Sequence, residues 1–469
     1  MGVATIRIFR HYLRMPFLVL GGAEFVAFLI SFYAGVRLRF AEQPEVIDDF
    51  VGPLWPRAVT FALVLIVALV AVGLYQARLR EGSSGIILRE VAGFALGGVG
   101  LALIFYLLPT VFTGRGALGL SLLFAFLASV VLRLFFYRLV DEDTLKKRVL
   151  VLGAGERAAS ITRYRRRVDQ RGFSIVGFVH IRGERDRVDP ERVIHLEGSL
   201  LDYARSREVE EIVVAIDDRR RSFPMDELLD CRMSGIEVIE LLTFYEREFG
   251  KVRLDLIHPS WLVFTDGYAQ GAFREYVKRG FDVVASLILM IPALPIMVVT
   301  AVAILLEDGW RQPVFYLQMR TGENGRPFRV IKFRSMVVDA EKGGQAQWAT
   351  QNDARITRVG AFIRKTRIDE LPQIINVLKG DMSFVGPRPE RPEFNQQLAA
   401  NIPYYDERHR VRPGITGWAQ LCYPYGASEE DAREKLQYDL YYVKNHSLFL
   451  DFVTLLQTVE VVLFGKGAR

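Results

Sequence analysis

The sequence predicts a multi-domain membrane protein. An N-terminal four-helix transmembrane bundle (residues 1–146) is followed by a Rossmann-like α/β domain (147–250), a linker (251–272) and an α-rich C-terminal domain (273–469). Hydrophobic residues make up 51% of the 469 residues, more than a soluble core requires. Most of the excess lies in long apolar stretches of the first third, after which short apolar runs alternate with helical segments.

Four apolar stretches approach or exceed the ~20 residues that cross a hydrocarbon layer of about 30 Å. They span residues 16–36, 58–75, 91–112 and 117–139. Arg133 lies late in the fourth stretch, where its side chain is expected to reach toward the membrane interface. Lys and Arg cluster before the first stretch and after the fourth, whereas the loop 42–56 is acidic and contains neither. Because cytoplasmic loops carry the excess of Lys and Arg, both ends of the bundle are expected to face the cytoplasm.

The α/β domain is indicated by short apolar runs at 149–152, 173–181, 211–216 and 236–241, which alternate with helical segments. This alternation predicts a parallel, doubly wound sheet. A glycine loop, Gly153-x-Gly155-x-x-Ala158, follows the first run, as in dinucleotide-binding folds. No acidic residue ends the second strand, where a ribose-binding carboxylate would be expected. Nucleotide binding and a vestigial or regulatory role both stay open for this domain.

The C-terminal domain begins with a further apolar run, 281–306, that contains Pro292 and Pro295. Each proline removes a backbone donor and clashes with the preceding turn, so a kink is expected. A kinked helix of this length either crosses the membrane a fifth time or returns as a re-entrant hairpin. In the hairpin each arm of ~12 residues would reach ~18 Å, about halfway across. The residues alone leave both alternatives open.

Charge and cysteine content narrow the classes of partner. The net charge is +6, which in so apolar a chain favours anionic lipid headgroups or a phosphorylated substrate over nucleic acid. No zinc-finger, RNA-binding aromatic or basic-zipper pattern supports nucleic-acid binding. Only Cys231 and Cys422 occur, which excludes a disulfide scaffold and a Cys-rich zinc site.

Several basic, turn-rich segments beyond residue 320 suit phosphate chemistry. Lys332 and Arg334 are two residues apart in a predicted strand, so their side chains share one face. Asp369 and Glu370 follow three cations; a carboxylate can attack phosphorus, and nearby arginines would keep it ionised. Prolines flank Arg388 and fix its backbone, which suits bidentate phosphate recognition. Each segment alone also fits a solvated basic strand or an ordinary helix start.

Together these segments resemble the bacterial sugar transferase family, the polyprenyl-phosphate hexose-1-phosphate transferases of the monotopic phosphoglycosyl transferase superfamily. The four predicted spans and the α/β domain resemble its long-form members. The matching motifs are Lys278-Arg279-x-x-Asp282, Lys332-Phe-Arg-Ser-Met336, Asp353-x-Arg355-Ile-Thr357, Asp369-Glu370-Leu-Pro-Gln373, the run 376–389 ending in Gly-Pro-Arg-Pro, and Arg412-Pro-Gly-Ile-Thr-Gly-Trp-Ala-Gln420.

The resemblance implies an enzyme of EC class 2.7.8, an undecaprenyl-phosphate sugar phosphotransferase. It would move a hexose-1-phosphate from a UDP-sugar to undecaprenyl phosphate with Mg²⁺, through an aspartyl-phosphosugar, and so initiate exopolysaccharide, capsule or O-antigen synthesis. Asp369 aligns with the nucleophile and with a metal ligand, and Glu370 with the second catalytic carboxylate. The residues expected to bind substrate are Lys332, Arg334, Arg355, Arg364, Arg388, Arg412, Thr416, Trp418 and Gln420.

The resemblance also favours the re-entrant hairpin. Pro295 aligns with the family's helix-breaking proline, but Leu294 stands where the family often has serine, so Pro292 is an alternative break. The expected location is the bacterial inner membrane with the catalytic domain facing the cytoplasm, among inner-membrane lipids, with surface for a homodimer and no nucleic-acid partner.

Two other functions are weighed against this one. A membrane-anchored nucleotide-sugar dehydratase also combines four spans with a Rossmann domain, but no tyrosine here has a lysine four residues later. A non-enzymatic polysaccharide assembly scaffold would have no need of Asp369 and Glu370. The sequence does not name the sugar.

Overall fold

A computed structural model describes residues 5–8, 11–42, 53–75, 83–140, 146–162, 173–218, 223–257, 271–338, 355–423, 426 and 428–464. The chain forms two compact units. The first comprises Met1–Ile8 and Tyr12–Phe249, and the second comprises Phe9–His11 and Gly250–Arg469. The units contain separate hydrophobic cores, one around the parallel sheet and one beneath the last long apolar helix.

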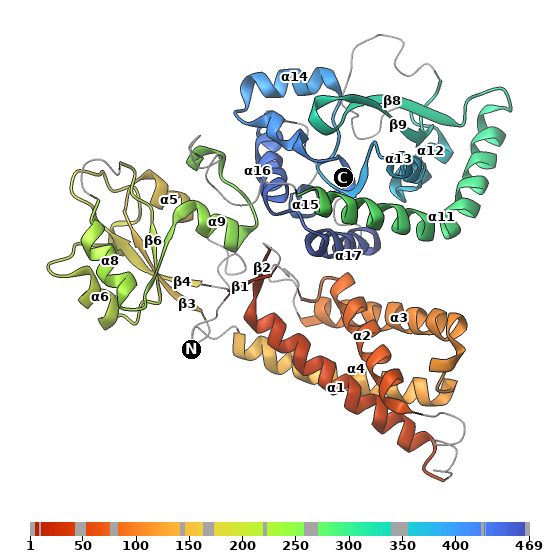
Figure 1. Cartoon of the computed structure of the whole chain (residues 1–469), viewed down its shortest axis with the longest axis horizontal. Helices are drawn as coiled ribbons and strands as arrows, with labels where there is room; N and C mark the ends of the chain where they lie inside the picture. The colour runs from red at the N-terminus through yellow and green to blue at the C-terminus, as the bar shows by residue number, and fades with distance from the viewer. Residues whose placement is uncertain are drawn as a thin grey trace. The chain divides into compact units, whose positions relative to one another are not determined.

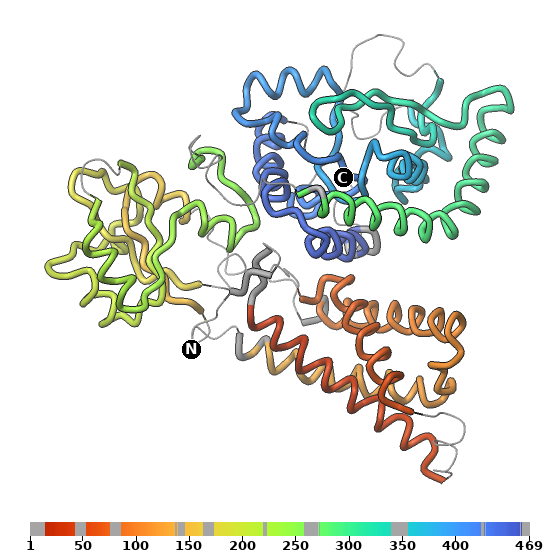
Figure 2. The backbone as a smooth tube through the Cα atoms, in the orientation of Figure 1, coloured from red at the N-terminus to blue at the C-terminus, as the bar shows by residue number. Residues whose placement is uncertain are grey.

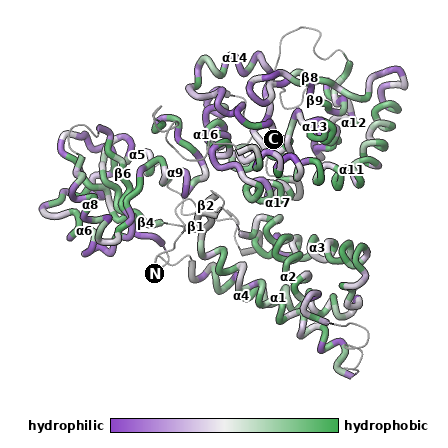
Figure 3. The backbone as a smooth tube through the Cα atoms, in the orientation of Figure 1, coloured by the Kyte–Doolittle hydropathy of each residue, from purple (hydrophilic) through white to green (hydrophobic). Residues whose placement is uncertain are grey.

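The first unit begins with two short strands and four apolar helices. They are β1 (Thr5–Ile8), β2 (His11–Arg14), α1 (Met15–Arg39), α2 (Leu54–Ala71), α3 (Ser83–Leu107) and α4 (Arg115–Val140), with the short helix η2 (Pro109–Val111) before α4. All four helices are long and apolar enough to cross a membrane, as predicted. Helix α1 packs against α2 and α4, and α3 packs against α2. Figure 3 shows that hydrophobic residues dominate these helices.

A network of buried charges joins these helices. Arg133 on α4 is 1% exposed, and its Nε lies 2.8 Å from Oε1 of Glu24 on α1. Glu24 also accepts hydrogen bonds from Ser129 (2.9 Å) and from the hydroxyl of Tyr75. The expectation that Arg133 reaches toward the interface is therefore wrong. Glu24 is a counterion for Arg133 between the packed helices, so the guanidinium is stabilised without contact with water.

The α/β part of the first unit contains a five-stranded parallel sheet in the order β5-β4-β3-β6-β7, as predicted. Strands β3 and β6 lie at its centre and are almost entirely buried, which explains their apolar character. The elements are β3 (Lys147–Leu152), α5 (Glu156–Thr162), β4 (Phe173–Val179), η4 (Pro190–Arg192), β5 (Val193–Ile194), α6 (Leu200–Ser206), β6 (Glu211–Val214), α8 (Met225–Met233), β7 (Glu237–Glu240) and α9 (Leu241–Phe249).

The second unit is mainly helical. An antiparallel hairpin of β8 and β9 and a short parallel pair of β10 and β11 supplement the helices. Its elements are η5 (Leu254–Leu256), α11 (Ala272–Asp308), β8 (Phe315–Thr321), η6 (Glu323–Gly325), β9 (Pro327–Phe333), α12 (Arg358–Lys365), η7 (Ile368–Glu370), α13 (Gln373–Lys379), β10 (Ser383–Val385), α14 (Pro392–Asn401), η8 (Tyr405–Arg410), β11 (Gly414–Thr416), α15 (Trp418–Cys422), α16 (Glu429–Asn445) and α17 (Leu448–Phe464).

Helix α11 holds the last long apolar run and is the fifth helix with the length and composition of a membrane span. Pro292 and Pro295 lie near its middle, and the helix changes direction sharply along its length (Figures 1 and 2). Its first turns are fixed to the rest of the unit by polar contacts. Lys278 donates to Asp451 on α17 (2.6 Å), and Asp282 accepts hydrogen bonds from Ser383 (3.0 Å) and from the Phe384 amide.

The segment that opens the second unit packs against the same body. The Val252 side chain is fully buried, and Lys251 forms an ion pair with Glu434 on α16 (3.0 Å). The indole nitrogen of Trp418 donates to the carbonyl oxygen of Gly250 (2.8 Å). Residues 258–270, the rest of the predicted linker, lie outside the described residues.

Candidate active site

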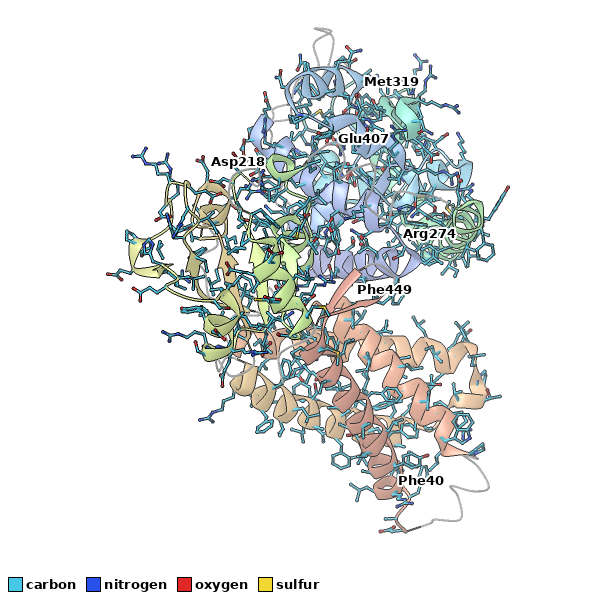
Figure 4. The ribbon with its side chains drawn as sticks, turned by 60° about the vertical axis from the view of Figure 1, so that its left-hand side comes forward. Phe40, Asp218, Arg274, Met319, Glu407 and Phe449 are labelled. Atoms are coloured by element: carbon cyan, nitrogen blue, oxygen red, sulfur yellow. The ribbon has the colours of Figure 1, made fainter. Side chains whose placement is uncertain are left out.

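The second unit contains a cavity of about 1510 Å³ that is open to solvent. Part of its wall is apolar and comes from α11, through Leu289, Pro292, Ala293 and Ile296. The remainder is rich in charged side chains from β8, β9, α12, η7, η8 and α16. In Figure 4 the labels Arg274, Met319 and Glu407 mark three of the elements of this unit, α11, β8 and η8. A cavity that is apolar on one side and cationic on the other suits a ligand that joins a lipid to a phosphate.

The two predicted catalytic carboxylates lie in the wall of this cavity. They belong to η7, a single turn that follows Arg367, whose φ of 60° is left-handed and uncommon for a residue with a side chain. Pro372 then starts α13, where its missing amide donor costs nothing. The turn breaks the path from α12 into α13 and places both carboxylates beside β9, because η7 packs on that strand.

Glu370 is surrounded by cations. Its Oε1 accepts hydrogen bonds from the Arg388 guanidinium (2.9 Å) and the Lys332 ammonium (3.1 Å), and Arg367 lies 3.9 Å away. Burial alone would raise the pKa of Glu370, but Arg388, Lys332 and Arg367 hold it well below the usual range of a glutamate. Glu370 is therefore ionised at physiological pH. Burial in turn lowers the pKa of Lys332, despite its partner.

Asp369 has a different environment. Burial raises its pKa above the ordinary value, and the negative charge of Glu370 raises it further. The Oδ1 atom of Asp369 is shielded from solvent and has no hydrogen-bond partner in the structure. Lys332, Arg367 and Arg388 act in the opposite direction and lower the pKa of Asp369, as expected for neighbouring cations, but the close contacts of Arg388 and Lys332 are made with Glu370. The result is one paired carboxylate and one poised, unpartnered carboxylate.

The other cations of the predicted set lie around the same cavity. Arg334, Arg355 and Arg364 contribute to its wall, as do Thr416 and Gln420. Arg334 is buried and pairs with Asp308 at the end of α11 (2.8 Å), while its Nε and Nη1 atoms have no partner in the structure. Buried guanidinium donors without a partner, on a residue in the cavity wall, are suited to an anionic ligand.

Two predicted binding residues make their contacts elsewhere. Arg412 pairs with Glu275 at the start of α11 (2.8 Å) and with Glu323 (3.3 Å). Trp418 is buried, and its ring lies 5.9 Å from that of Tyr441. Of the two prolines, Pro292 lines the cavity. Asp353 of the Asp-x-Arg-Ile-Thr motif falls outside the described residues.

The cavity wall also contains charged residues that the sequence analysis did not single out. They are Arg320, Glu390, Arg391, Arg408, Lys435 and Asp439. Arg408 and Asp439 form a buried ion pair (2.7 Å). A signal was available for Asp439, since it interrupts a run of apolar and aromatic residues on α16. Arg408 lies in a dense basic run in which no single position stands out.

The glycine loop of the α/β part is occupied by the protein itself. Both carboxylate oxygens of Asp217 accept amide hydrogen bonds at the start of α5, from Glu156 (2.8 Å) and Arg157 (2.9 Å). A Cβ atom on Gly155 would stand 2.1 Å from the Asp217 carboxylate, which accounts for the glycine. A phosphate at these amides would have to displace Asp217.

Apolar helices of membrane-spanning length, a parallel α/β sheet, and a cationic cavity containing two carboxylates are typical of a membrane protein with a site suited to phosphate groups. Residues 273–465 match the model of the family described as bacterial sugar transferase.

Three relatives extend this comparison. A UDP-N-acetylgalactosamine-undecaprenyl-phosphate N-acetylgalactosaminephosphotransferase of Aeromonas hydrophila is 45% identical over 242 residues, 52% of this chain and 56% of the relative. A UDP-glucose:undecaprenyl-phosphate glucose-1-phosphate transferase of Xanthomonas campestris pv. campestris is 31% identical over 354 residues, 73% of this chain and 72% of the relative. An undecaprenyl-phosphate galactose phosphotransferase of Salmonella typhimurium is 29% identical over 358 residues, 71% and 73% of the two chains. The chain belongs to the bacterial sugar transferase family, and it spans little more than half of the Aeromonas relative.

Proposed function

We propose that this protein transfers a hexose-1-phosphate from a UDP-sugar to undecaprenyl phosphate, and so initiates a bacterial surface polysaccharide. The observation that carries the proposal is the Oδ1 atom of Asp369, which lies without a partner in the wall of a cationic cavity. A carboxylate oxygen without a hydrogen-bond partner is available for attack, and a diphosphate needs cations close to the point of attack. The names of the three relatives all include undecaprenyl phosphate, and those of the Aeromonas and Xanthomonas relatives also include a UDP-sugar, which supports the same acceptor and donor classes.

In the proposed first step, a carboxylate oxygen of Asp369 attacks the sugar-linked phosphorus of the UDP-sugar. The bond from that phosphorus to the bridging oxygen breaks, and UMP leaves with the electron pair. In the second step, a phosphate oxygen of undecaprenyl phosphate attacks the same phosphorus. The aspartyl–phosphorus bond breaks, which regenerates the Asp369 carboxylate and gives the lipid diphosphate sugar.

The environment of Asp369 supports its part in both steps. The raised pKa of Asp369 makes its carboxylate a stronger nucleophile than an exposed aspartate once it is ionised. Lys332 and Arg388 are held in place by Glu370, so their charges lie beside the reacting phosphate without any reorganisation. The two substrates are both anionic, and these cations reduce the repulsion between them.

Magnesium fits this site with one protein ligand. Among the described residues no group of three or more His, Cys, Asp and Glu side chains could hold a metal ion alone. Mg²⁺ is usually held by one or two carboxylates together with substrate phosphates. Lys332 and Arg388 pair closely with Glu370, so Asp369 is the carboxylate that would hold the ion alongside the donor diphosphate. When bound, the ion would neutralise charge on the phosphates.

We also propose that α11 enters from the cytoplasmic face of the inner membrane and returns to it. The change of direction along α11 and the two prolines near its middle support a re-entrant hairpin. Nucleotide sugars are cytoplasmic, so Asp369 has to lie on that side. Lys278 and Arg279 precede the apolar run 281–306 within α11, and basic residues follow it, as in segments that remain near an anionic inner leaflet.

The activity is tested by incubating the purified protein with undecaprenyl phosphate, Mg²⁺ and a panel of radiolabelled UDP-sugars. Transfer of label to lipid is expected with one or a few donors, together with release of UMP. Asp369→Asn should abolish transfer and prevent the labelled protein intermediate. Near-normal transfer by this variant would contradict the assignment of Asp369 as the nucleophile.

The topology is tested with single cysteines placed near residues 270 and 345 in a chain that lacks Cys231 and Cys422. Both should resist a membrane-impermeant reagent in intact cells. Periplasmic labelling near residue 345 alone would show a full crossing. Replacement of Pro292 and Pro295 by leucine should straighten α11, expose residue 345 to the reagent and reduce transfer.

A further inference from the structure

Arg408 is a buried arginine whose guanidinium contacts three different groups. Its side chain is 7% exposed and forms an ion pair with Asp439 on α16 at 2.7 Å. One terminal nitrogen donates to the hydroxyl of Tyr405 (2.7 Å), and the other donates to the backbone carbonyl oxygen of Arg388 (3.0 Å). The last contact connects η8 to the turn that carries a residue of the proposed active site.

The turn around Arg388 depends on outside donors. Pro387 and Pro389 have no amide hydrogen, so the turn lacks the donors with which most tight turns hold themselves. Its carbonyl groups are instead bound by other parts of the unit. The Pro387 oxygen accepts from the Gly414 amide (3.0 Å), and the Pro389 oxygen accepts from Arg320 (3.1 Å). Arg408 binds the carbonyl between these two.

The position of this carbonyl matters because it belongs to the residue that binds Glu370. Nη2 of Arg388 lies 2.9 Å from Oε1 of Glu370, next to Asp369 in the chain. Rotation of the Arg388 peptide group would move its Cα–Cβ bond and with it the guanidinium. A continuous series of contacts therefore runs from Asp439 through Arg408 and Arg388 to Glu370.

We propose that Arg408 is a positioning residue for the phosphotransfer site, which fixes the Arg388 turn through the Arg388 carbonyl and is itself anchored by Asp439 and Tyr405. This inference rests on the proposed function, since it assigns a role in the same reaction. Arg408 acts through Arg388. A planar guanidinium bonds three acceptors in fixed directions, which a lysine ammonium, a compact charge on a flexible stem, does not reproduce.

The test compares Arg408→Lys with Arg410→Gln in the full-length protein, in the UDP-sugar transfer assay. Arg410 lies on the same short helix, but its side chain is 63% exposed and pairs with Glu407, so it serves as the control. Displacement of a catalytic group by about 1 Å costs about 100-fold in rate. We expect Arg408→Lys to lower kcat by about 100-fold with an unchanged folding signature, and Arg410→Gln to retain the wild-type rate.

A double-mutant cycle distinguishes positioning from a general structural role. If Arg408 acts through Arg388, adding Arg408→Lys to Arg388→Gln should lower kcat by less than about threefold beyond the single Arg388→Gln variant. A further loss of about 100-fold would overturn the positioning role. So would an Arg408→Lys variant with the wild-type rate.

Two further results complete the test. If Arg408→Lys does not fold, Tyr405→Phe replaces it in the test, because it removes only one contact of Arg408. Tyr405→Phe should lower kcat severalfold in the wild-type protein but not in the Arg388→Gln variant. Equal losses of kcat in both proteins would overturn the proposal. Should Arg388→Gln itself transfer at the wild-type rate, the proposed function of this site would fail, and the role of Arg408 with it. An additive loss would refute the role of Arg408 alone.

Discussion

Replacing Asp369 with asparagine should make the folded protein more stable while it ends sugar-phosphate transfer. In the wild type, the charge of Asp369 is next to the ionised Glu370, and its Oδ1 atom is buried without a hydrogen-bond partner. Both features raise the free energy of the folded state. Asparagine is close to aspartate in shape, carries no charge, and brings an amide that can donate to a carboxylate.

The expected gain follows from these two features. A buried acceptor without a partner costs about 1–3 kcal/mol, and more when it is charged. Asparagine removes the charge and leaves a neutral oxygen in the same place. We therefore expect Asp369→Asn to raise the free energy of unfolding of the second unit by about 1–3 kcal/mol near pH 8.

The gain should depend on pH in a defined direction. The pKa of Asp369 is raised in the folded state above the value of 3.8 for an exposed aspartate. Between these two pKa values the folded state holds more protons than the unfolded state, so the wild type becomes more stable as the pH falls through this window. The advantage of Asp369→Asn should be largest above the native pKa and should shrink toward pH 4.

The measurement is thermal unfolding of both full-length proteins in lipid nanodiscs between pH 8 and pH 4, alongside the transfer assay. Asp406→Asn serves as the control, because the side chain of Asp406 is 76% exposed and its replacement should change stability by no more than about 0.5 kcal/mol. An inactive Asp369→Asn protein that melts below the wild type at pH 8 would refute the reasoning. So would an advantage that grows toward pH 4.

Three further predictions concern neighbouring features. Glu370→Gln should act in the opposite direction to Asp369→Asn and destabilise the second unit by about 3 kcal/mol, because Lys332 and Arg388 lose their buried counterion; an unchanged melting temperature would contradict this. A chain starting at Gly250 should fold and transfer sugar phosphate. A chain starting at Gly271 should be less stable by about 2–3 kcal/mol, because it loses the buried Val252 and the Gly250 carbonyl that binds Trp418. Equal melting temperatures of the two chains would show that residues 250–270 are dispensable for stability. Arg133→Leu should lower the stability of the apolar helices of the first unit by about 3–5 kcal/mol in a chemical-denaturation series, since Glu24 is left buried and unpaired; a loss below 1 kcal/mol would show that water reaches Glu24.

The elements with strong local signals were predictable from the sequence. The four apolar helices and the parallel strands follow from composition and periodicity over short windows, and each is present. Strand β5 was not predicted, because two residues are too few for a periodic pattern. Asp369 and Glu370 were predictable as a pair from the motif alone, and they do lie in one cavity.

What could not be predicted depends on partners far away in the chain. Arg133 and Glu24 are 109 residues apart, so no local pattern pairs them. Arg408 contacts Arg388 and Asp439, which lie on different elements, and only the fold brings the three together. The different surroundings of Asp369 and Glu370 also depend on residues far away in the chain, because Lys332 on β9 and Arg388 both pair with Glu370.

The Asp217 carboxylate, which binds the amides at the start of α5, has a consequence for the stability of the α/β domain. A domain whose phosphate loop is filled by a soluble ligand becomes more stable as that ligand's concentration rises, by RT ln(1 + [L]/Kd). Here the anion is part of the chain, so its effective concentration does not change with the nucleotide pool. The α/β domain therefore carries its own anion at these amides, and the contribution of this contact to folding does not require a free nucleotide.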